Sequence, residues 1–279
     1  MENIISQRDA LDLIYDPTVT FIDGSWYLPA QKRDGRAEFA ANRIPGATYF
    51  DIDKISDQDT DLPHMLPSAE QFRSMVEELG ISSEDLNIVY DGPGLFSAPR
   101  VWWTLKVMGA KQVKILEGGF DSWKSNDLPI EQGPLEVRTR KEFTPNFQAD
   151  RVADIGSVIA NLESKQATVI DARPVDRYNG TGTEPRPGLR NGHIPGSKSA
   201  PSSKFVHNGK LADHNTLERI FRDLDIGRDT EVITTCGSGV TAAILALALA
   251  ETGRDSFRLF DGSWAEWGKP DGPAIKTNG

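Results

Sequence analysis

Cysteine is nearly absent from this chain, because Cys236 is the one cysteine among 279 residues. A single cysteine excludes an intrachain disulfide, a multi-cysteine zinc site and an iron–sulfur cluster. The sequence also lacks a dinucleotide-binding fingerprint and a P-loop, so we expect neither a metal nor an organic cofactor. The thiol of Cys236 is therefore either a small buried apolar group or a reactive one.

Basic residues and long apolar segments are also scarce. The chain has 31 Lys and Arg against 41 Asp and Glu, a net charge of −10, which disfavours nucleic acid or an anionic membrane as a partner. The longest apolar run, residues 242–250, is about half a membrane span. The N-terminal residues show neither a secretory signal nor an Arg-rich transit peptide. We therefore expect a cytoplasmic protein without a membrane partner.

What the chain does contain is an internal repeat. Short patterns recur in the same order at offsets of 144 to 150 residues. The paired segments are 21–23 with 169–171, 44–46 with 194–196, and 117–123 with 261–267. Such a long period indicates a duplicated domain rather than a solenoid. We predict an N-terminal domain at 1–124, a polar, Pro-containing linker at 125–146 and a C-terminal domain at 147–279.

Each copy alternates short apolar runs with helical patterns. In the second copy the expected strands are 167–170, 231–235 and 257–260, and the expected helices are 215–224 and 241–252. Asn215 or Thr216 is the predicted N-cap of the first helix, and Gly253 is the predicted stop of the second. This alternation predicts an α/β fold in which each copy has a mostly parallel sheet flanked by helices.

The segment from Cys236 to Thr241 reads Cys-Gly-Ser-Gly-Val-Thr and follows a predicted buried strand. Two glycines between a strand and a helix allow successive backbone N–H groups to turn inward and form an anion-binding concavity. The same N–H groups and the helix dipole would stabilise a thiolate. Cysteine phosphatases use a similar loop but need an Arg six positions after the Cys. Ala242 stands there, which disfavours phosphatase chemistry.

This loop resembles the active-site loop of the 3-mercaptopyruvate sulfurtransferases, within the two-domain rhodanese-like family. The resemblance covers nearly the whole chain and includes segments 97–103 and 261–267. It implies two tandem rhodanese-like domains and a persulfide carried on Cys236. The repeat places Asp91 at the cysteine position of the first copy, which we therefore expect to be catalytically silent. Thiosulfate-specific rhodaneses carry Arg-Lys in place of Gly237-Ser238.

The resemblance also implies roles for other polar residues. Arg177 and Arg186 are the expected binders of the substrate carboxylate, since a guanidinium bonds a carboxylate bidentately. Arg173 is a weaker candidate that suits a structural ion pair. The implied proton relay consists of Ser238, His64 and Asp53. The remaining loop residues complete the expected substrate-binding set, which adds Gly237, Gly239, Val240 and Thr241.

The expected activity is transfer of the sulfur of 3-mercaptopyruvate to Cys236, with release of pyruvate. No second cysteine exists to resolve the persulfide, so the acceptor must be an external thiol, cyanide or a thioredoxin-like protein. Two alternatives stay open. One is a thiosulfate:cyanide sulfurtransferase with the same fold and nucleophile, and the other is a non-catalytic sulfur-carrier or interaction module.

Overall fold

The computed structural model describes residues 2–134 and 138–278. The chain forms two units: the first consists of residues up to 58 with 66–148 and 208–211, and the second of 59–65, 149–207 and 212 onward. The domain boundaries expected from the sequence (1–124, 125–146 and 147–279) stay a prediction. Within those segments, residues 1, 135–137 and 279 lie outside the described residues.

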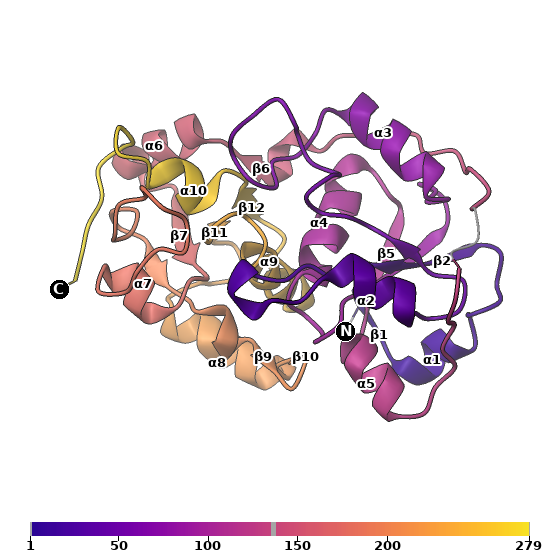
Figure 1. Cartoon of the computed structure of the whole chain (residues 1–279). Coiled ribbons are helices and arrows are strands. Elements are labelled where there is room, and N and C mark those ends of the chain that lie inside the picture. Colours follow the sequence, from indigo (N-terminus) through magenta and orange to yellow (C-terminus); the bar gives the residue numbers. More distant parts are fainter. Residues whose placement is uncertain (1, 135–137, 279) are drawn as a thin grey trace. The chain divides into compact units, whose positions relative to one another are not determined.

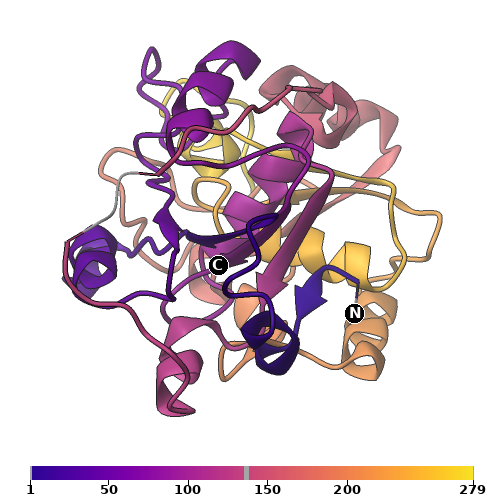
Figure 2. The same ribbon diagram turned by 90° about the vertical axis from the view of Figure 1, so that its right-hand side faces the viewer.

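The first unit is built on a five-stranded parallel sheet. Its strands are β1 (Ile4–Ile5), β2 (Val19–Asp23), β3 (Thr48–Tyr49), β4 (Leu86–Tyr90) and β5 (Gln112–Leu116). They lie in the order β1-β5-β4-β2-β3, and every pair is parallel. In Figure 2 the short N-terminal strand β1 lies at the edge of this sheet. The central strands are buried on both faces, as expected when helices cover both sides.

Helices cover both faces of this sheet (Figure 1). They are α1 (Gln7–Leu11), α2 (Gly35–Ala41), α3 (Ala69–Glu78), α4 (Ala98–Met108) and α5 (Gly119–Ser125), with a 3₁₀ turn at Pro29–Gln31. One core cluster contains Phe21, Phe39 and Trp123. In a separate aromatic group, Phe72 packs between the tilted ring of Phe50 and the edge-on ring of Phe143. Phe143 is fully buried there, so the polar stretch that precedes the second sheet packs on the first unit.

The second unit repeats the same topology. Its sheet consists of β6 (Val152–Ala153), β7 (Ala167–Asp171), β8 (Lys198–Ser199), β11 (Glu231–Thr235) and β12 (Phe257–Phe260), in the order β6-β12-β11-β7-β8 and all parallel. Two further short strands, β9 (Val206–His207) and β10 (Lys210–Leu211), lie outside the five-stranded sheets. The identical strand order in the two sheets confirms the predicted α/β fold and the duplication.

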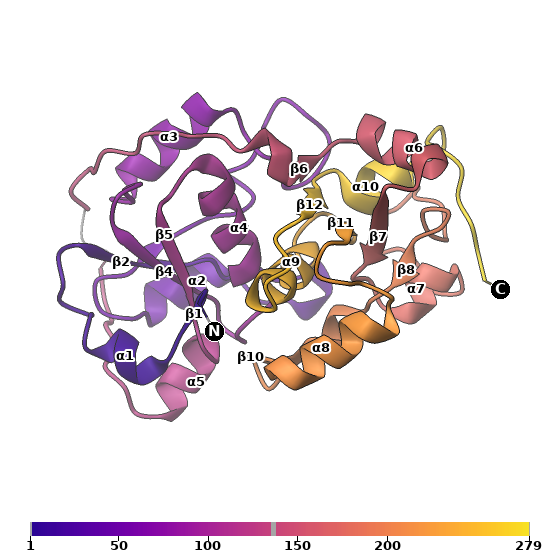
Figure 3. The same cartoon turned by 180° about the vertical axis from the view of Figure 1, so that it is seen from behind.

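The helices of the second unit are α6 (Ile155–Ser164), α7 (Val175–Asn179), α8 (His214–Asp223), α9 (Ala242–Glu251) and α10 (Ser263–Trp267), with 3₁₀ turns at Ala149–Arg151 and Ser202–Lys204. Helix α9 packs on β11 and β12 (Figure 3) and is buried over eight consecutive residues. This burial on all sides explains why its sequence is almost entirely Ala, Leu and Ile.

The predicted elements of the second copy are confirmed, with one correction. The helix expected to begin after Asn215 or Thr216 begins at His214, and its N-cap is Asp213. The Asp213 carboxylate accepts a hydrogen bond from the Thr216 backbone N–H at 3.0 Å. The predicted cap was wrong because Asp213 precedes Asn215 by two residues. At that position its carboxylate accepts the Thr216 N–H and faces the positive end of the helix dipole. Gly253 follows α9 with a φ of 66°, which confirms the predicted stop.

Within the described residues, no helix combines the length and the apolar character that crossing a membrane requires.

A buried aspartate recurs in both copies, but its bonding partners differ between them. Asp23 and Asp171 end equivalent strands, β2 and β7. Asp171 forms a buried ion pair with Arg173, at 2.6 Å between Oδ2 and Nη2. Asp23 has Ser25 at the corresponding position, and its Oδ1 accepts the Ser25 N–H at 2.8 Å. Burial without a facing cation, reinforced by the charge of Asp91, raises the pKa of Asp23 to about 7.

This difference predicts how stability depends on pH. A carboxyl whose pKa is higher in the folded protein stabilises it fully below the unfolded pKa near 4, and this contribution is lost as the pH rises through about 7. Asp23→Asn keeps the hydrogen-bond acceptor and cannot ionise. We expect the variant to gain free energy of unfolding relative to the wild type between pH 5 and pH 8 in urea denaturation. A difference that does not change with pH would refute the buried, proton-binding role of Asp23.

Candidate active site

The loop that carries Cys236 leaves the carboxyl end of β11 and enters α9. The Cys236 residue is 2% exposed. Its carbonyl accepts the Trp264 N–H at 2.9 Å, and the Gly237 carbonyl accepts the Ala265 N–H at 2.9 Å. The Cys236 N–H donates to the Ser263 hydroxyl at 3.2 Å. Contacts with the start of α10 therefore fix the backbone on both sides of the thiol.

The first unit contains the same loop with a different side chain at its head. The Asp91 carbonyl accepts the Phe120 N–H at 2.8 Å, and the Gly92 carbonyl accepts the Asp121 N–H at 2.9 Å, which repeats the pattern around Cys236. Gly94 and Gly239, 145 residues apart, have nearly equal φ angles of 77° and 78°. Only glycine adopts this left-handed conformation without strain, so both loops need glycine at this position.

Asp91 shows where the N–H groups of such a loop point. Its Oδ2 accepts backbone N–H groups from Phe96 at 2.8 Å, Ser97 at 2.7 Å and Ala98 at 2.8 Å. Burial raises the pKa of Asp91, and these N–H groups act in the opposite direction because they favour the ionised carboxylate. The first unit thus holds a carboxyl group where the second unit holds a thiol, and its catalytic silence stays a prediction.

The 145-residue offset transfers this geometry to the second unit. Thr241 and Ala242 are the counterparts of Phe96 and Ser97, so we expect their N–H groups to face a negatively charged sulfur on Cys236. The next counterpart, Ala243, instead donates its N–H to the Val240 carbonyl at 3.3 Å. Gly239 supplies the left-handed turn, and Val240 is buried at 3% exposure. This arrangement supports the loop roles expected for Gly239, Val240 and Thr241, which remain predictions until a ligand is bound.

The structure brings both predicted carboxylate-binding arginines to the same loop. A Cβ atom added at Gly237 would lie 3.1 Å from Nη2 of Arg177 and 3.9 Å from Nη1 of Arg186. Arg177 belongs to the last turn of α7, and its side chain is 18% exposed. Two guanidinium groups therefore lie beside the residue that follows the thiol. At 3.1 Å from Nη2 of Arg177, a side chain at residue 237 would press on this guanidinium, and glycine avoids that contact.

Arg173 forms the structural ion pair that its position suggested. Its guanidinium bonds Asp171, the Gly192 carbonyl at 2.8 Å and Glu184 at 2.8 Å, and lies 4.1 Å above the Trp264 ring. Burial works against its charge, but Asp171 and Glu184 outweigh this effect and raise the pKa of Arg173. Sequence reasoning missed Glu184. The one available signal was an acidic residue two positions before Arg186 in an otherwise cationic motif.

Ser238 and His64 are also brought together. His64 Nδ1 lies 3.1 Å from Ser238 Oγ, and both residues are 5% exposed. His64 has a φ of 63°, an uncommon conformation for a residue with a side chain. Although it lies in the first half of the sequence, its segment 59–65 counts with the second unit. Asp53 belongs to the first unit, where its Oδ2 accepts the Trp26 indole N–H at 3.0 Å, and its link to His64 stays a prediction.

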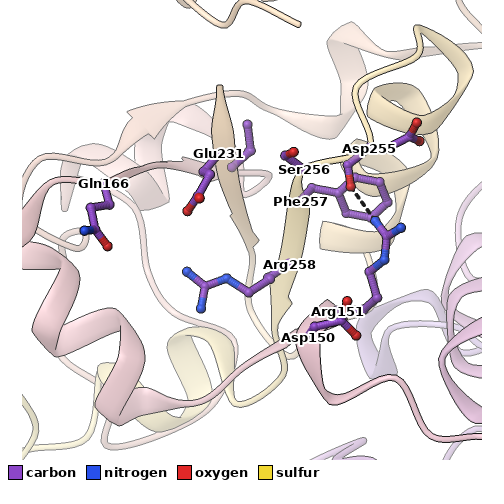
Figure 4. A pocket seen from close by; sticks show the side chains of 9 residues that line it. Asp150, Arg151, Gln166, Glu231, Asp255, Ser256, Phe257 and Arg258 are labelled. Atoms are coloured by element: carbon purple, nitrogen blue, oxygen red, sulfur yellow. Dashed lines mark hydrogen bonds between the residues drawn. The ribbon is translucent and has the colours of Figure 1, made fainter. Parts of the chain in front are cut away.

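A pocket of about 540 Å³ lies elsewhere in the second unit (Figure 4). Its lining includes Glu231 at the start of β11 and Phe257 and Arg258 at the start of β12. In Figure 4 the Arg258 side chain extends toward the side lined by Gln166 and Glu231. The pocket is therefore at the amino ends of the strands, opposite the edge that carries Cys236. In parallel sheets, ligands bind at the carboxyl ends, so this pocket is not the candidate active site.

Over residues 2–134 and 138–278, no cluster of three or more His, Cys, Asp or Glu residues is arranged to hold a metal ion.

Comparisons with known proteins agree with this geometry. The family model of the rhodanese-like domain matches twice, at residues 7–126 and 154–270. The 3-mercaptopyruvate sulfurtransferase of Escherichia coli K12 is 42% identical over 256 residues, covering 91% of both chains. The human 3-mercaptopyruvate sulfurtransferase is 37% identical over 252 residues, covering 88% of this chain and 84% of its own.

A plant relative and a solved structure extend this similarity. The mitochondrial thiosulfate/3-mercaptopyruvate sulfurtransferase 1 of Arabidopsis thaliana is 38% identical, covering 92% of this chain and 74% of its own. The crystal structure of SseA from Escherichia coli, a 3-mercaptopyruvate sulfotransferase, superposes with a TM-score of 0.87 at 38% identity and covers 95% of this chain and 99% of its own. The matches span both repeats and 74–99% of the length of these relatives. The chain therefore belongs to the two-domain rhodanese-like sulfurtransferase family.

Proposed function

We propose that this chain is a sulfurtransferase that takes the sulfur of 3-mercaptopyruvate onto Cys236 and releases pyruvate. The observation that carries the proposal is the convergence at one loop of a buried thiol, two guanidinium groups and a hydroxyl bonded to an imidazole. Each group matches one part of the substrate. The similarity to relatives that carry this name, at 37–42% identity, supports the same conclusion.

The proposed reaction begins with loss of the Cys236 thiol proton to the Ser238–His64 pair. The thiolate attacks the sulfur of 3-mercaptopyruvate, so an S–S bond forms and the S–C bond breaks. The electron pair of that bond remains on the departing carbon, which becomes the enolate of pyruvate. The proton then passes from the Ser238–His64 pair to this carbon, leaving pyruvate and a persulfide on Cys236.

Arg177 and Arg186 are the proposed binders of the substrate carboxylate. Their guanidinium groups flank Gly237, one residue from the nucleophile, so a bound carboxylate is held a short distance from Cys236. An α-keto acid with its thiol on the next carbon spans this distance with a few bonds. Fixing both ends of the molecule aligns the sulfur with the thiolate and removes much of the entropy cost of the encounter.

The second half of the cycle returns Cys236 to a thiolate. The acceptor is proposed to be external, either a thiol, cyanide or a thioredoxin-like protein, because no other cysteine exists in the chain. Its nucleophilic atom attacks the outer sulfur of the persulfide, and the Cys236 thiolate leaves. The cytoplasmic location expected from the sequence remains part of this proposal.

Thiosulfate is the second candidate donor. The plant relative named a thiosulfate/3-mercaptopyruvate sulfurtransferase is 38% identical to this chain, which gives the alternative support. A sulfur-carrier module without turnover is the remaining alternative. It predicts that Cys236 is loaded with sulfur but that product accumulates no further than one equivalent per chain.

The covalent intermediate is directly measurable. Intact-mass spectrometry after incubation with 3-mercaptopyruvate is expected to show an increase of about 32 Da, one sulfur atom, because the nucleophile retains the sulfur. Peptide mapping should place it on Cys236, and Cys236→Ser should show no increase. Active protein without this adduct would contradict the persulfide scheme.

Removal of one guanidinium tests the carboxylate site. Arg177→Ala loses a charged hydrogen-bond pair of about 1.5–3 kcal/mol, so KM for 3-mercaptopyruvate should rise about 10- to 100-fold. Glu184 keeps Arg173 as its partner, which preserves the buried network in this variant. Arg219→Ala, on the exposed face of α8, is the matched control. Unchanged steady-state kinetics of the Arg177 variant would remove Arg177 from the site.

A donor comparison separates the candidate functions. The ratio of kcat/KM for 3-mercaptopyruvate to that for thiosulfate is expected to exceed one, because no loop side chain adds a cation at Gly237 or Ser238. Changing Gly237-Ser238 to Arg-Lys should shift preference toward the dianion thiosulfate. A wild-type protein that prefers thiosulfate would overturn the assignment, and a single turnover with either donor would favour the carrier module.

A further inference from the structure

A chain of buried ion pairs leads from the sheet to the candidate active site. Asp171 pairs with Arg173 at 2.6 Å, Arg173 with Glu184 at 2.8 Å, and Glu184 with Arg177 at 2.6 Å. Glu184 Oε1 also accepts a hydrogen bond from Arg177 Nε at 3.3 Å, so the carboxylate binds one edge of that guanidinium with both oxygens. Arg177 is the last member, and it is the one that reaches Gly237.

Glu184 links the two arginines of this ion-pair network, because its carboxylate pairs with both Arg173 and Arg177. Its side chain is 3% exposed, that of Arg173 is 1% exposed, and that of Arg177 is 18% exposed. Water therefore screens these charges little. The four groups comprise two carboxylates and two guanidiniums, so their charges sum to zero. Arg177 thus faces the site with donors of fixed orientation while its positive charge is balanced from behind.

We propose that Glu184 determines which anions the site accepts, by cancelling one positive charge behind Arg177 and so favouring singly charged over doubly charged donors. This inference rests on the proposed function, in which the donor is an anion held beside Gly237. A dianion interacts with any uncompensated charge twice as strongly as a monoanion does. The cancelled charge therefore costs a dianion such as thiosulfate twice what it costs the monoanion 3-mercaptopyruvate.

A merely structural role for Glu184 predicts a different result. If Glu184 only holds Arg173 and Arg177 in place, its loss would weaken the binding of every anion to a similar extent. If its charge matters, the loss would alter the ratio between dianion and monoanion affinity. Glu184→Gln keeps the shape of the side chain and removes the charge. Glu184→Asp keeps the charge and shortens the side chain.

The test measures the binding of sulfate, a dianion, and of pyruvate, a monoanion, by titration calorimetry of the full chain. Low ionic strength of about 10 mM keeps electrostatic effects unscreened. Arg177→Ala should weaken both anions, which locates their binding at this site. The exposed Glu163→Gln on α6 gives the same change in net charge away from the network.

For Glu184→Gln, the ratio of sulfate to pyruvate affinity is expected to rise roughly 5- to 10-fold, since one added charge multiplies dianion affinity by the square of its effect on a monoanion. Glu184→Asp and Glu163→Gln should leave this ratio within about twofold of wild type. An unchanged ratio in Glu184→Gln, or the same rise in Glu163→Gln, would overturn the proposal.

A second variant covers failure of Glu184→Gln to fold. Asp171→Asn removes the other carboxylate of the ion-pair network, while Arg173 retains Glu184 and the Gly192 carbonyl as partners. The ratio of sulfate to pyruvate affinity should shift in the same direction by a smaller factor. Asp171 is connected to Arg177 only through Arg173 and Glu184, so its charge acts on the site from farther away. A shift in the opposite direction, or none, would overturn the proposal.

Kinetics with the two donors separates this inference from the proposed function. In Glu184→Gln, kcat/KM for thiosulfate should rise relative to kcat/KM for 3-mercaptopyruvate. A wild-type chain that turns over neither donor would refute the proposed function. The binding ratio would then still decide the role of Glu184, because it requires no turnover.

Discussion

Backbone N–H groups at the start of a helix have no partner inside that helix, and the first unit of this chain places an acidic side chain against them. In the first unit the group is the Asp91 carboxylate, which accepts three N–H groups. In the second unit Cys236 occupies the equivalent position on a loop held by equivalent hydrogen bonds. The duplication therefore produces one loop headed by a carboxylate and one headed by a thiol, and the role of that thiol as the nucleophile is our proposal.

The surroundings of the two loops differ in charge. Asp23 ends β2 without a facing cation, and burial raises its pKa to about 7. The equivalent Asp171 is bonded to Arg173, which extends through Glu184 to Arg177. The second unit thus uses its buried aspartate to anchor guanidinium groups at the active loop. This network holds Arg177 beside Gly237, although the chain as a whole has a net charge of −10.

The sequence was sufficient for the fold, while the roles that it predicts for the site residues stay predictions. The repeat and its alternating pattern predicted a mostly parallel sheet in each copy, and the Cys-Gly-Ser-Gly loop predicted that Cys236 is the nucleophile. Arg177 and Arg186 came from the family resemblance, and the structure places both beside Gly237. Glu184 was not predicted, because an acidic residue in a cationic motif resembles a solvated one until its burial is seen. The N-cap at Asp213 was missed since three neighbouring polar residues all suit that position.

The proposed mechanism requires the loop after β11 to bind a negatively charged sulfur through its backbone N–H groups. A crystal structure of the protein treated with 3-mercaptopyruvate tests this most directly. The outer sulfur of the persulfide should lie within hydrogen-bonding distance of the Thr241 and Ala242 N–H groups, as the Asp91 carboxylate does from Phe96 and Ser97. A persulfide whose outer sulfur points away from these N–H groups would contradict the proposal that the loop binds a negatively charged sulfur.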